Sequence, residues 1–599
     1  MTAPSGEPLA ARPPLGRIAL VGALIAALLL LTGARNILTG QFPDPDDTLR
    51  MVQVRDLLAG QNWFDTTQYR IDPPGGVPMH WSRLVDVPLA LVALAMQPLL
   101  GSATALATAA VIVPLLTFGC LVLLVGWVAS RYFDTEVTGF AALCCGVVPV
   151  TLTQMQALRI DHHGWQIVGV VAAVAGLLQP NTARGAWIAG LSLAVVLSIS
   201  IEGLPFAAAF AGRYALRRLI DPAERTGLAH YMTALASGSV LVFLATRGPA
   251  ALTPWCDAVA PAHLAFFTVV AACCWLLSVP RALPRWAVVV GLGLAGGAGL
   301  SVFVALAPAC LATPFGNLDP LVREYWYLNV SEGLPAWRQT PARLGASLPP
   351  VLLALGALVG LYRTTEGAEQ RWWRDYLLLF ATAVLAGLLV WRSMAFAGAL
   401  AAVPLGWLLS RLLSALRAWR QRADVCYAAG VLALVVMGSA AILWLPNGRA
   451  QASVSAPAGL SSAVRESRCE LRRNAPLLDR FEPATIFAPL DIGPSLIERS
   501  HHAVVATGHH RAQAAMHDVV AAFMSDEDDA RKTITAHGAS LVVVCADLVE
   551  PAIYAADAPK GLIADLLAGD TPAWLEPVDI GAPPALKVWR VRPQAIKQP

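Results

Sequence analysis

A short polar segment, Asp161-His162-His163-Gly164, lies between two long apolar runs in a chain that otherwise keeps charge out of such places. Ionisable groups at a membrane boundary are costly, and they are retained where they have a function. An aspartate and a histidine two positions apart, Asp161 and His163, can ligate one divalent cation from a single loop. Carboxylate oxygen together with imidazole suits Mn²⁺ or Mg²⁺ better than a structural zinc site, which more often uses several Cys or His ligands.

A second acidic cluster, Asp44-Pro45-Asp46-Asp47, follows the first apolar run and precedes a segment with the apolar spacing of an amphipathic helix. Acidic residues favour a helix N-terminus, so helix capping is one interpretation. One aspartate satisfies that need and three are present, so we expect a functional role for at least one of them. The two clusters together predict a metal site assembled from distant loops.

Two more residues could contribute to such a site. Glu332 lies in a Gly/Pro loop that is rich in aromatic residues, where a glutamate taken alone is usually just solvated. Arg392 separates the apolar runs 376–391 and 393–410. A lone arginine there could extend its side chain to the membrane interface. Near an acidic metal site, however, it is well placed to hold a phosphate.

The composition is that of a polytopic membrane protein. Of 599 residues, 56% are hydrophobic and only 14% are charged, whereas ordinary soluble domains have about 25% charged residues. The net charge is only +3 and the basic residues fall in short loops, so we expect no nucleic-acid partner. The first apolar run, 16–34, has no small-residue cleavage site close after it, which indicates a retained anchor and not a signal peptide.

Apolar runs of about 17 to 25 residues predict about thirteen transmembrane helices. They lie near 16–34, 103–128, 137–155, 164–179, 186–201, 204–218, 228–246, 262–279, 286–307, 347–362, 376–391, 393–410 and 425–445. The segment 84–100 is also apolar, but Pro88 and Pro98 interrupt it. Counting it as a span would place Asp44 and Asp161 on opposite membrane faces. We therefore expect a partly embedded helix that does not cross.

Basic residues cluster in the loops that this topology assigns to the cytoplasm. The clusters are Arg12 and Arg17; Arg131; Arg184; Arg213, Arg217, Arg218 and Arg225; Arg281 and Arg285; Arg363, Arg371 and Arg374; and Arg411, Arg417, Arg420 and Arg422. The outer face then holds the loops 35–102 and 308–346, the Asp161 loop, the Glu202 turn and everything after about 446. All the unusual acidic residues share one compartment.

After about residue 450 the hydrophobic runs shorten and charge returns, which predicts a small α/β domain outside the membrane. The expected strands are at 537–546 and 585–592, and the expected helices are at 511–536 and 560–568. Cys469 and Cys545 would face an oxidising space. The sequence leaves open whether they form a disulfide or remain free thiols. The remaining cysteines mostly lie in apolar runs and are interpreted as packing residues.

Four motifs, in order and on one face, resemble the catalytic subunits of oligosaccharyltransferases, which are membrane glycosyltransferases of the GT-C class. An Asp-Pro-x-x-x-x-Arg signature is matched by Asp44, Pro45 and Arg50, and an archaeal Asp-His-His variant by Asp161, His162 and His163. A Ser-Val-Ser-Glu motif with a following Pro is approximated by Asn329-Val330-Ser331-Glu332 and Pro335, and an arginine that opens a late span is similar to Arg392. The resemblance covers residues 16–445, and the family is expected to have thirteen spans.

The resemblance implies a GT-C-like polytopic α-helical membrane protein with a small C-terminal α/β extramembrane domain. The implied division is a cytoplasmic tail at 1–15, a transmembrane catalytic domain at 16–445 and a periplasmic domain at 446–599. The implied roles are Mn²⁺ or Mg²⁺ ligation by Asp44, Asp161 and His163, catalysis by Asp44 and Glu332, and donor phosphate binding by Arg392. Asp46, Asp47, Arg50 and His162 are secondary candidates.

The implied activity is metal-dependent transfer of a sugar or oligosaccharide from a polyprenyl phosphate or diphosphate in the lipid bilayer. The acceptor is a protein, a lipid or a polysaccharide on the periplasmic side of the inner membrane. Two alternatives are a transporter or flippase of a lipid-linked glycan and a non-catalytic glycan-binding relative. Acidic residues that gather on one face, without an obvious internal repeat, favour the transferase over the transporter.

One family motif has no counterpart. The family's extramembrane domain carries Trp-Trp-Asp-Tyr-Gly, which reads the Ser or Thr of an asparagine acceptor; no match occurs within 446–599, and Trp372-Trp373 falls in a predicted cytoplasmic loop. The resemblance therefore does not extend to transfer to protein asparagine. The domain instead contains Asp491-Ile492-Gly493-Pro494 and the histidine pairs His501-His502 and His509-His510. These residues could line another acceptor site, but the preferred interpretation is ordinary turn and surface residues, because adjacent histidines point in different directions.

Overall fold

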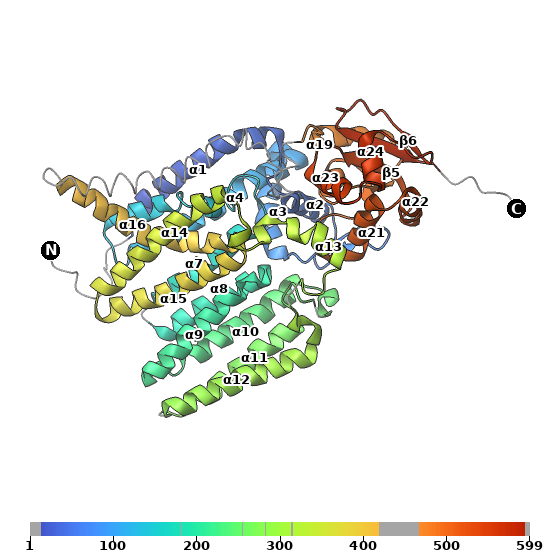
Figure 1. Cartoon of the computed structure of the whole chain (residues 1–599). Helices are drawn as coiled ribbons and strands as arrows, with labels where there is room; N and C mark the ends of the chain where they lie inside the picture. The colour runs from blue at the N-terminus through green and yellow to red at the C-terminus, as the bar shows by residue number, and fades with distance from the viewer. Residues whose placement is uncertain are drawn as a thin grey trace.

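A bundle of long helices and a small α/β domain at one end of it form the structure (Figure 1). It is a computed structural model that describes residues 13–418, apart from 180, 254, 282, 313 and 314, and residues 467–592. The predicted span 425–445 lies outside the described residues. The protein is thus a polytopic helical membrane protein with a C-terminal mixed α/β domain, as the composition and the change of character after residue 450 predicted.

Sixteen helices form the part before residue 419. They are α1 (Leu15–Thr39), α2 (Pro45–Leu58), α3 (Arg83–Leu100), α4 (Ser102–Ala129), α5 (Thr135–Cys144), α6 (Pro149–Leu152), α7 (His163–Gly176), α8 (Thr182–Ile199), α9 (Leu204–Ile220), α10 (Gly227–Thr246), α11 (Pro261–Ser278), α12 (Arg285–Leu306), α13 (Pro320–Tyr325), α14 (Pro341–Thr364), α15 (Gly367–Leu389) and α16 (Met394–Ala418). Three single 3-10 turns matter for the site: η1 (Ile201–Gly203), η6 (Ser331–Gly333) and η8 (Trp391–Ser393).

Ten helices in the described residues are long and apolar enough to cross a membrane. Nine of them lie at predicted spans, and the tenth is α3. Two more predicted spans are shorter helices, α7 and α9. The prediction of one helix over 137–155 is wrong, because α5 ends at Cys144 and a turn separates it from α6, which begins at Pro149. A proline is favoured at a first helical position, where its missing N–H costs nothing.

α1 and α4 pack in opposite directions. A Cβ on Gly126 of α4 would lie 2.7 Å from the Ile18 side chain of α1, and a Cβ on Gly22 of α1 would lie 3.3 Å from the Val122 side chain of α4. The end of α1 and the start of α4 are therefore at the same end of the bundle. The connection between them, including α3, leaves and returns at that end, which supports the expectation that α3 does not cross.

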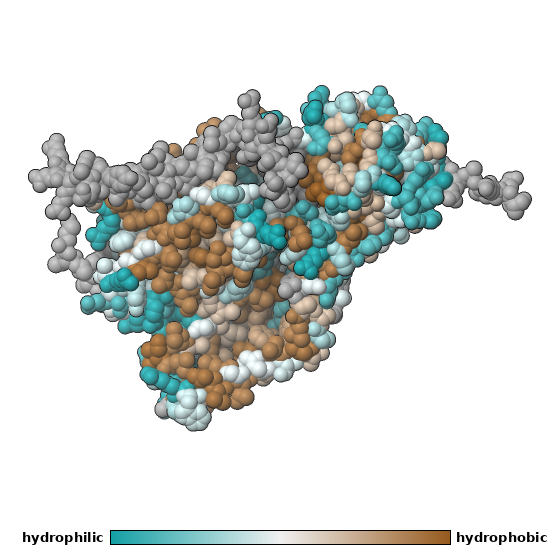
Figure 2. Space-filling model, in the orientation of Figure 1, coloured by the Kyte–Doolittle hydropathy of each residue, from teal (hydrophilic) through white to brown (hydrophobic). Residues whose placement is uncertain are grey.

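The bundle is apolar where lipid would contact it. In Figure 2 hydrophobic residues cover the sides of the helices, whereas hydrophilic residues gather on the C-terminal domain and at the opposite end of the bundle. Leucines on α11, α12 and α15 are largely exposed, among them Leu276, Leu294 and Leu389. Exposed apolar side chains in such number indicate a surface that faces hydrocarbon and not water.

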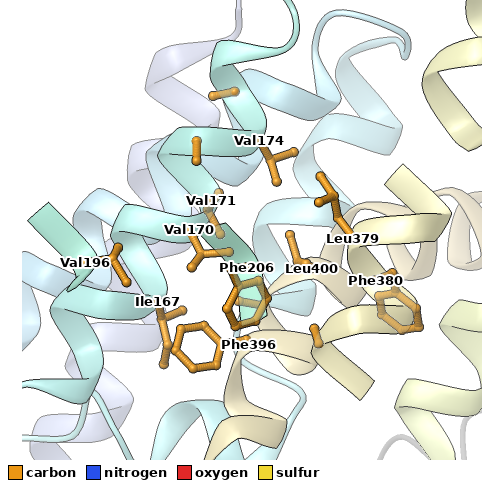
Figure 3. Packing of buried hydrophobic residues seen from close by; sticks show 14 of the residues in the cluster. Ile167, Val170, Val171, Val174, Val196, Phe206, Leu379, Phe380, Phe396 and Leu400 are labelled. Carbon is orange, nitrogen blue, oxygen red and sulfur yellow. The ribbon is translucent and has the colours of Figure 1, made fainter. Parts of the chain in front are cut away.

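The helix that starts at His163 is held by a large apolar core. Ile167, Val170, Val171 and Val174 of α7 are buried in the cluster that also contains side chains of α8, α9, α15 and α16 (Figure 3). Close packing of this kind leaves little freedom to the backbone. The N-terminal residue of α7 is therefore fixed relative to the surrounding helices.

The C-terminal domain has a five-stranded mixed sheet in the order β4-β3-β5-β7-β6. Its strands are β3 (Thr485–Phe487), β4 (Ala503–Val504), β5 (Ala539–Cys545), β6 (Leu575–Pro577) and β7 (Leu586–Val591), and its helices are α19 (Leu471–Asn474), α20 (Gly493–Arg499), α21 (Gln513–Met524), α22 (Glu527–Ala536), α23 (Val549–Asp557) and α24 (Leu562–Ala568). β3 pairs in parallel with β4 and β5, whereas β7 is antiparallel to β5 and β6. The predicted strands at 537–546 and 585–592 correspond to β5 and β7, and the predicted helices to α21, α22 and α24.

The first outer loop continues the sheet of this domain. The Asp72 N–H donates to the Val504 carbonyl at 3.0 Å, and the Val504 N–H donates to the Arg70 carbonyl at 2.8 Å. The same loop contains the short hairpin of β1 (Thr67–Gln68) and β2 (Val77–Pro78). Buried side chains of the loop, such as Trp81, belong to the core of the C-terminal domain. The domain is therefore joined to the bundle through a shared apolar core.

Two disulfides lie on the side of the molecule that carries this domain. One joins Cys469 and Cys545, the pair for which the sequence left a bridge open. The other joins Cys256, after α10, and Cys310, after α12, and it was not predicted. Cys310, Cys469 and Cys545 all lie in segments that the sequence predicts to be on the outer face.

Candidate active site

Four carboxylates from three distant segments surround the guanidinium of Arg159. Its Nη1 lies 3.2 Å from Asp44 Oδ2 and 3.2 Å from Asp47 Oδ2. Its Nη2 lies 3.4 Å from Glu332 Oε2 and 4.0 Å from Asp161 Oδ2. The structure thus brings together Asp44, Asp161 and Glu332, which the sequence analysis selected on motif and sidedness. It also places Arg159 at their centre, a role that the sequence did not reveal.

The first turn of α2 supplies the aspartates of the first cluster. Asp44 is the N-cap, and its Oδ1 accepts the N–H of Asp46 at 3.0 Å. Its other oxygen faces Arg159, so capping and a site role, posed as alternatives, are combined in one residue. Asp47 is fully buried, and its Oδ1 accepts the N–H of Asp161 at 2.8 Å. Asp47 therefore fixes the second loop against the first.

Burial makes this acidic cluster hard to ionise without a cation. Desolvation raises the pKa of Asp47 to about 8, against the lowering effect of Arg159. Desolvation and the neighbouring Asp44 and Asp161 also raise the pKa of Asp46 well above its usual range. Like charges at such spacing favour protonation unless positive charge compensates them. The single positive charge of Arg159 does not fully compensate the carboxylates around it.

The second loop presents Asp161 between two imidazoles. His163 Nε2 lies 3.2 Å from Asp161 Oδ2, and His162 Nδ1 hydrogen-bonds with Asp161 Oδ1. Burial opposes ionisation of Asp161, but His162, His163 and Arg159 hold its pKa well below the usual range. Burial lowers the pKa of His163 to about 3, so the ring is neutral, as a metal ligand must be. Ligand atoms of Asp161, His162 and His163 all lie within 4.8 Å of one another.

The candidate metal group that the described residues form here contains Asp161 and His163 together with His162, whereas Asp44 contacts Arg159. Ligation of one ion by Asp44, Asp161 and His163 stays a prediction. This mixture of oxygen and nitrogen donors is compatible with Mn²⁺ or Mg²⁺ and with other divalent metals.

Arg392 lies at the other side of Glu332. Its Nη1 is 3.5 Å from Glu332 Oε1, and its Nε donates to Glu202 Oε1 at 2.9 Å. Burial opposes ionisation of Glu202, but Arg392 lowers its pKa to about 2. Glu202 was placed on the outer face but given no role. Its position between two apolar runs, like that of Arg392, was the signal that could have identified it.

Arg50 lies behind Asp161 and is fully buried. Its Nη1 is 2.9 Å from Asp86 Oδ1, its Nη2 is 3.7 Å from Asp161 Oδ1, and its guanidinium lies 4.8 Å from the Trp81 ring centre. Arg83 binds the other oxygen of Asp86 at 3.1 Å. The secondary candidate Arg50 therefore acts through Asp161, which it positions. Arg83 and Asp86 were missed because both lie at the start of an apolar segment.

A small pocket lies beside Asp161 and Arg159, between α4 and the start of α7, with a cavity volume of about 10 Å³. Gly164 lines it together with Thr117 and Gln154. A Cβ on Gly164 would lie 3.0 Å from the Gln154 carbonyl oxygen, a backbone atom that cannot rotate away. The glycine that ends the Asp-His-His-Gly segment is thus required by the close approach of two backbone segments.

Replacing Gly164 by alanine is expected to lower the activity of this site by about 100-fold, because the new methyl group displaces the start of α7 and misplaces His163. Activity and melting temperature are measured in parallel. Gly119→Ala on α4 is the matched control, since a Cβ there meets nothing within 4 Å. Equal rates for the two variants would contradict this role of Gly164.

The C-terminal domain also reaches this site. The ring centres of His162 and His80 lie 6.4 Å apart, and those of His80 and His509 lie 5.1 Å apart. His509 is buried. The interpretation of His509 and His510 as ordinary surface residues is therefore wrong for this pair. His502 is fully buried too, so the surface interpretation holds only for the exposed His501 in the other pair; both rings hydrogen-bond with backbone carbonyls of their own domain.

Comparison with solved structures gives matches over nearly the whole chain. The archaeal oligosaccharyltransferase of Archaeoglobus fulgidus, tethered with an acceptor peptide containing the NVT sequon, matches with a TM-score of 0.65 and 15% identity, over 97% of this chain and 75% of that one. The fold is that of an archaeal oligosaccharyltransferase. The resemblance inferred from the four motifs is thus confirmed for the fold, which is GT-C-like.

Two other structures of this archaeal enzyme give the same result. AglB from A. fulgidus in complex with an inhibitory peptide and a dolichol-phosphate matches with a TM-score of 0.63 and 16% identity, over 94% of this chain and 72% of that one. Its complex with Zn and sulfate matches with a TM-score of 0.57 and 14% identity, over 96% of this chain and 74% of that one. No protein-family model and no curated protein sequence matches the chain.

Proposed function

We propose that this protein is a metal-dependent membrane glycosyltransferase. It moves a sugar or oligosaccharide from a polyprenyl phosphate or diphosphate to an acceptor on the periplasmic side of the inner membrane. The observation that carries the proposal is the convergence of Asp44, Asp161, Glu332 and Arg392, from four separate segments, within one connected network. Buried charges converging from distant segments are the mark of a functional site more often than of a stabilising one.

The donor enters from the lipid bilayer, because the site residues lie at the starts of α2 and α7 and just before α16, at the ends of apolar helices. A sugar attached to a polyprenyl chain is already in that phase, whereas nucleotide sugars remain in the cytosol. The dolichol-phosphate in the archaeal complex is a ligand of this chemical class. Arg392 is the residue that holds the phosphate, since a guanidinium matches phosphate oxygens with paired donors.

Transfer breaks the bond between the anomeric carbon and the phosphate oxygen. The electron pair of that bond goes to the phosphate, and Arg392 stabilises the charge that develops there. The acceptor nucleophile forms the new bond to the anomeric carbon and loses its proton. Asp44 and Glu332 orient the acceptor and take up that proton. Asp47 holds the Asp161 loop in place by accepting the Asp161 N–H, and Arg50 positions the Asp161 carboxylate.

A divalent cation would be held by Asp44, Asp161 and His163. When bound, it supplies positive charge next to the leaving phosphate. Arg159, between the carboxylates, keeps them together and limits their repulsion.

The acceptor is a protein, a lipid or a polysaccharide, and Trp372 and Trp373 have no part in its recognition. Both are buried against Tyr132 and Phe133, in the part of α15 that belongs to the predicted cytoplasmic end. The absence of a Trp-Trp-Asp-Tyr-Gly match within 446–599 favours an acceptor other than a protein asparagine.

The proposal is tested with purified full-length protein and synthetic polyprenyl phosphate and diphosphate sugars. We expect sugar release from the lipid to require Mn²⁺ or Mg²⁺, to fall to background with a chelator and to return when the metal is restored. Mass spectrometry of surface glycans from cells with and without the gene then identifies the acceptor. Movement of an intact lipid-linked sugar across vesicles, without cleavage and with chelator present, would instead establish a flippase.

A further inference from the structure

Three histidines at the junction between the bundle and the C-terminal domain form a compact cluster outside the acidic site. His80 comes from the first outer loop, and His509 and His510 come from the loop before α21. Their ring centres are 5.1 Å apart for His80 and His509, 5.0 Å for His80 and His510, and 5.1 Å for His509 and His510. One ligand atom from each lies within 4.8 Å of the others.

These distances match a shared metal ion. Three imidazoles bound to one tetrahedral Zn²⁺ at about 2.0–2.1 Å have ring centres about 5 Å apart and nitrogens about 3.3 Å apart. His80 Nδ1 and His509 Nε2 are 3.0 Å apart, so an opening of a few tenths of an ångström places both nitrogens at ligand distance. Three histidines that only hydrogen-bond with one another can lie at unequal distances. Three ligands of one ion lie at similar distances from one another.

One ring of the cluster is incompletely paired within the protein. The Nδ1 of His509 is buried and has no hydrogen-bond partner in the described part of the chain. A buried nitrogen without a partner is costly.

The third histidine is oriented by a carboxylate. His510 Nε2 lies 2.6 Å from Asp257 Oδ2, which leaves Nδ1 of that ring for a ligand. Metal-bound histidines commonly use their second nitrogen in this way. Asp257 is itself held by Arg511, whose Nη2 lies 2.7 Å from Oδ1, and it follows Cys256, which is fixed by the disulfide to Cys310. Asp257 therefore pairs with the charge of Arg511 whether or not a cation is bound.

We propose that His80, His509 and His510 form a second metal site, of the zinc class, that ties the C-terminal domain to the first outer loop. Imidazole ligands suit Zn²⁺ and neighbouring transition metals, whereas the acidic site offers carboxylates. Three protein ligands leave the fourth position to water. The two sites thus differ in the metals that they retain.

In a third cluster, backbone groups bind three of the four histidine ring nitrogens, and the fourth, His501 Nδ1, faces Asp479 at 3.5 Å. Around Asp479, His502 Nδ1 accepts the N–H of Ala484 at 3.1 Å and its Nε2 donates to the Leu478 carbonyl at 2.9 Å. His501 Nε2 donates to the Phe481 carbonyl at 3.0 Å. Backbone partners occupy these nitrogens, so His501 provides a matched control for His509.

The test uses full-length protein in detergent, stripped with a chelator and titrated with Zn²⁺ alone, in an Asp161→Asn background that weakens the acidic site. We expect one Zn²⁺ to remain bound. His509→Ala or His80→Ala lowers its affinity by at least about 100-fold, a loss at the upper end of what second-shell changes cause. His501→Ala leaves the affinity unchanged.

A spectroscopic measurement needs no histidine variant. In the same Asp161→Asn protein, Co²⁺ as the probe is expected to give the intense visible absorption of a tetrahedral site. Octahedral Co²⁺ absorption, no bound Zn²⁺ in the Asp161→Asn protein, or unchanged affinity in both His509→Ala and His80→Ala would each overturn the second site. Because none of these readouts measures transfer, failure of the second site and failure of the proposed function are distinguishable.

Discussion

Replacement of Asp161 by asparagine is expected to lower the transfer rate at saturating donor by about 1000-fold, or about 4 kcal/mol in the activation barrier. Asparagine has the same shape but lacks the charge that lies between His162 and His163 and next to Arg159. We expect the chain to fold, because the Asp161 N–H still donates to Asp47. The rate is measured as sugar released from the polyprenyl donor.

A matched control is Asp526→Asn, which changes an N-cap aspartate of α22 in the C-terminal domain, away from the site. Asparagine caps a helix about as well as aspartate, so this variant is expected to keep both its stability and the full transfer rate. The metal requirement gives a second readout: the Asp161→Asn variant should need a higher Mn²⁺ concentration for half-maximal activity. Full activity of Asp161→Asn at the wild-type metal concentration would remove Asp161 from the metal site.

Replacement of Arg392 by alanine is expected to lower kcat/KM by about 100-fold or more, because the guanidinium that pairs with the leaving phosphate is lost. Arg392→Lys keeps a charge without the planar pair of donors, so it should recover only part of the activity. Arg338→Ala is the control, since Arg338 lies on the 308–346 outer loop and is exposed. Donor titrations with monophosphate and diphosphate carriers measure the effect.

Loss of Arg392 also leaves Glu202 without its ion-pair partner, and a charge left unpaired in a buried network destabilises the fold. The double variant Glu202→Gln/Arg392→Ala separates the two effects. It should recover the melting temperature lost in Arg392→Ala and remain as inactive as that variant. Recovery of both stability and activity would show that Arg392 serves only to neutralise Glu202.

The periodicity and composition of the sequence predicted most of the helices, because an apolar run long enough to span hydrocarbon must satisfy its own backbone hydrogen bonds. The prediction of one continuous helix over 137–155 was wrong because this segment does not face hydrocarbon. Apolar residues there are buried inside the bundle, where a turn before Pro149 finds protein partners, so no continuous helix is required.

The site was predicted in part for a different reason. Asp44 and Asp161 were selected because charges among apolar runs on one face are unusual, and Glu332 because its motif resembles that of the oligosaccharyltransferases. Both arguments concern single residues or short motifs. Arg159 carries the same signal, but its contact with carboxylates from both other segments depends on how the loops fold over α2. Asp47 was ranked only as a secondary candidate, but its two oxygens accept the Asp161 N–H and the Arg159 guanidinium N–H.

The sequence by itself determined that this chain lies in a membrane and which residues on its outer face carry unusual charge, because both follow from the cost of placing polar groups in hydrocarbon. Only the tertiary structure decided that Arg159 stands among the carboxylates, that Glu202 pairs with Arg392, and that His80 meets His509 and His510. These contacts join residues far apart in the chain. They depend on packing between segments, which no local pattern records.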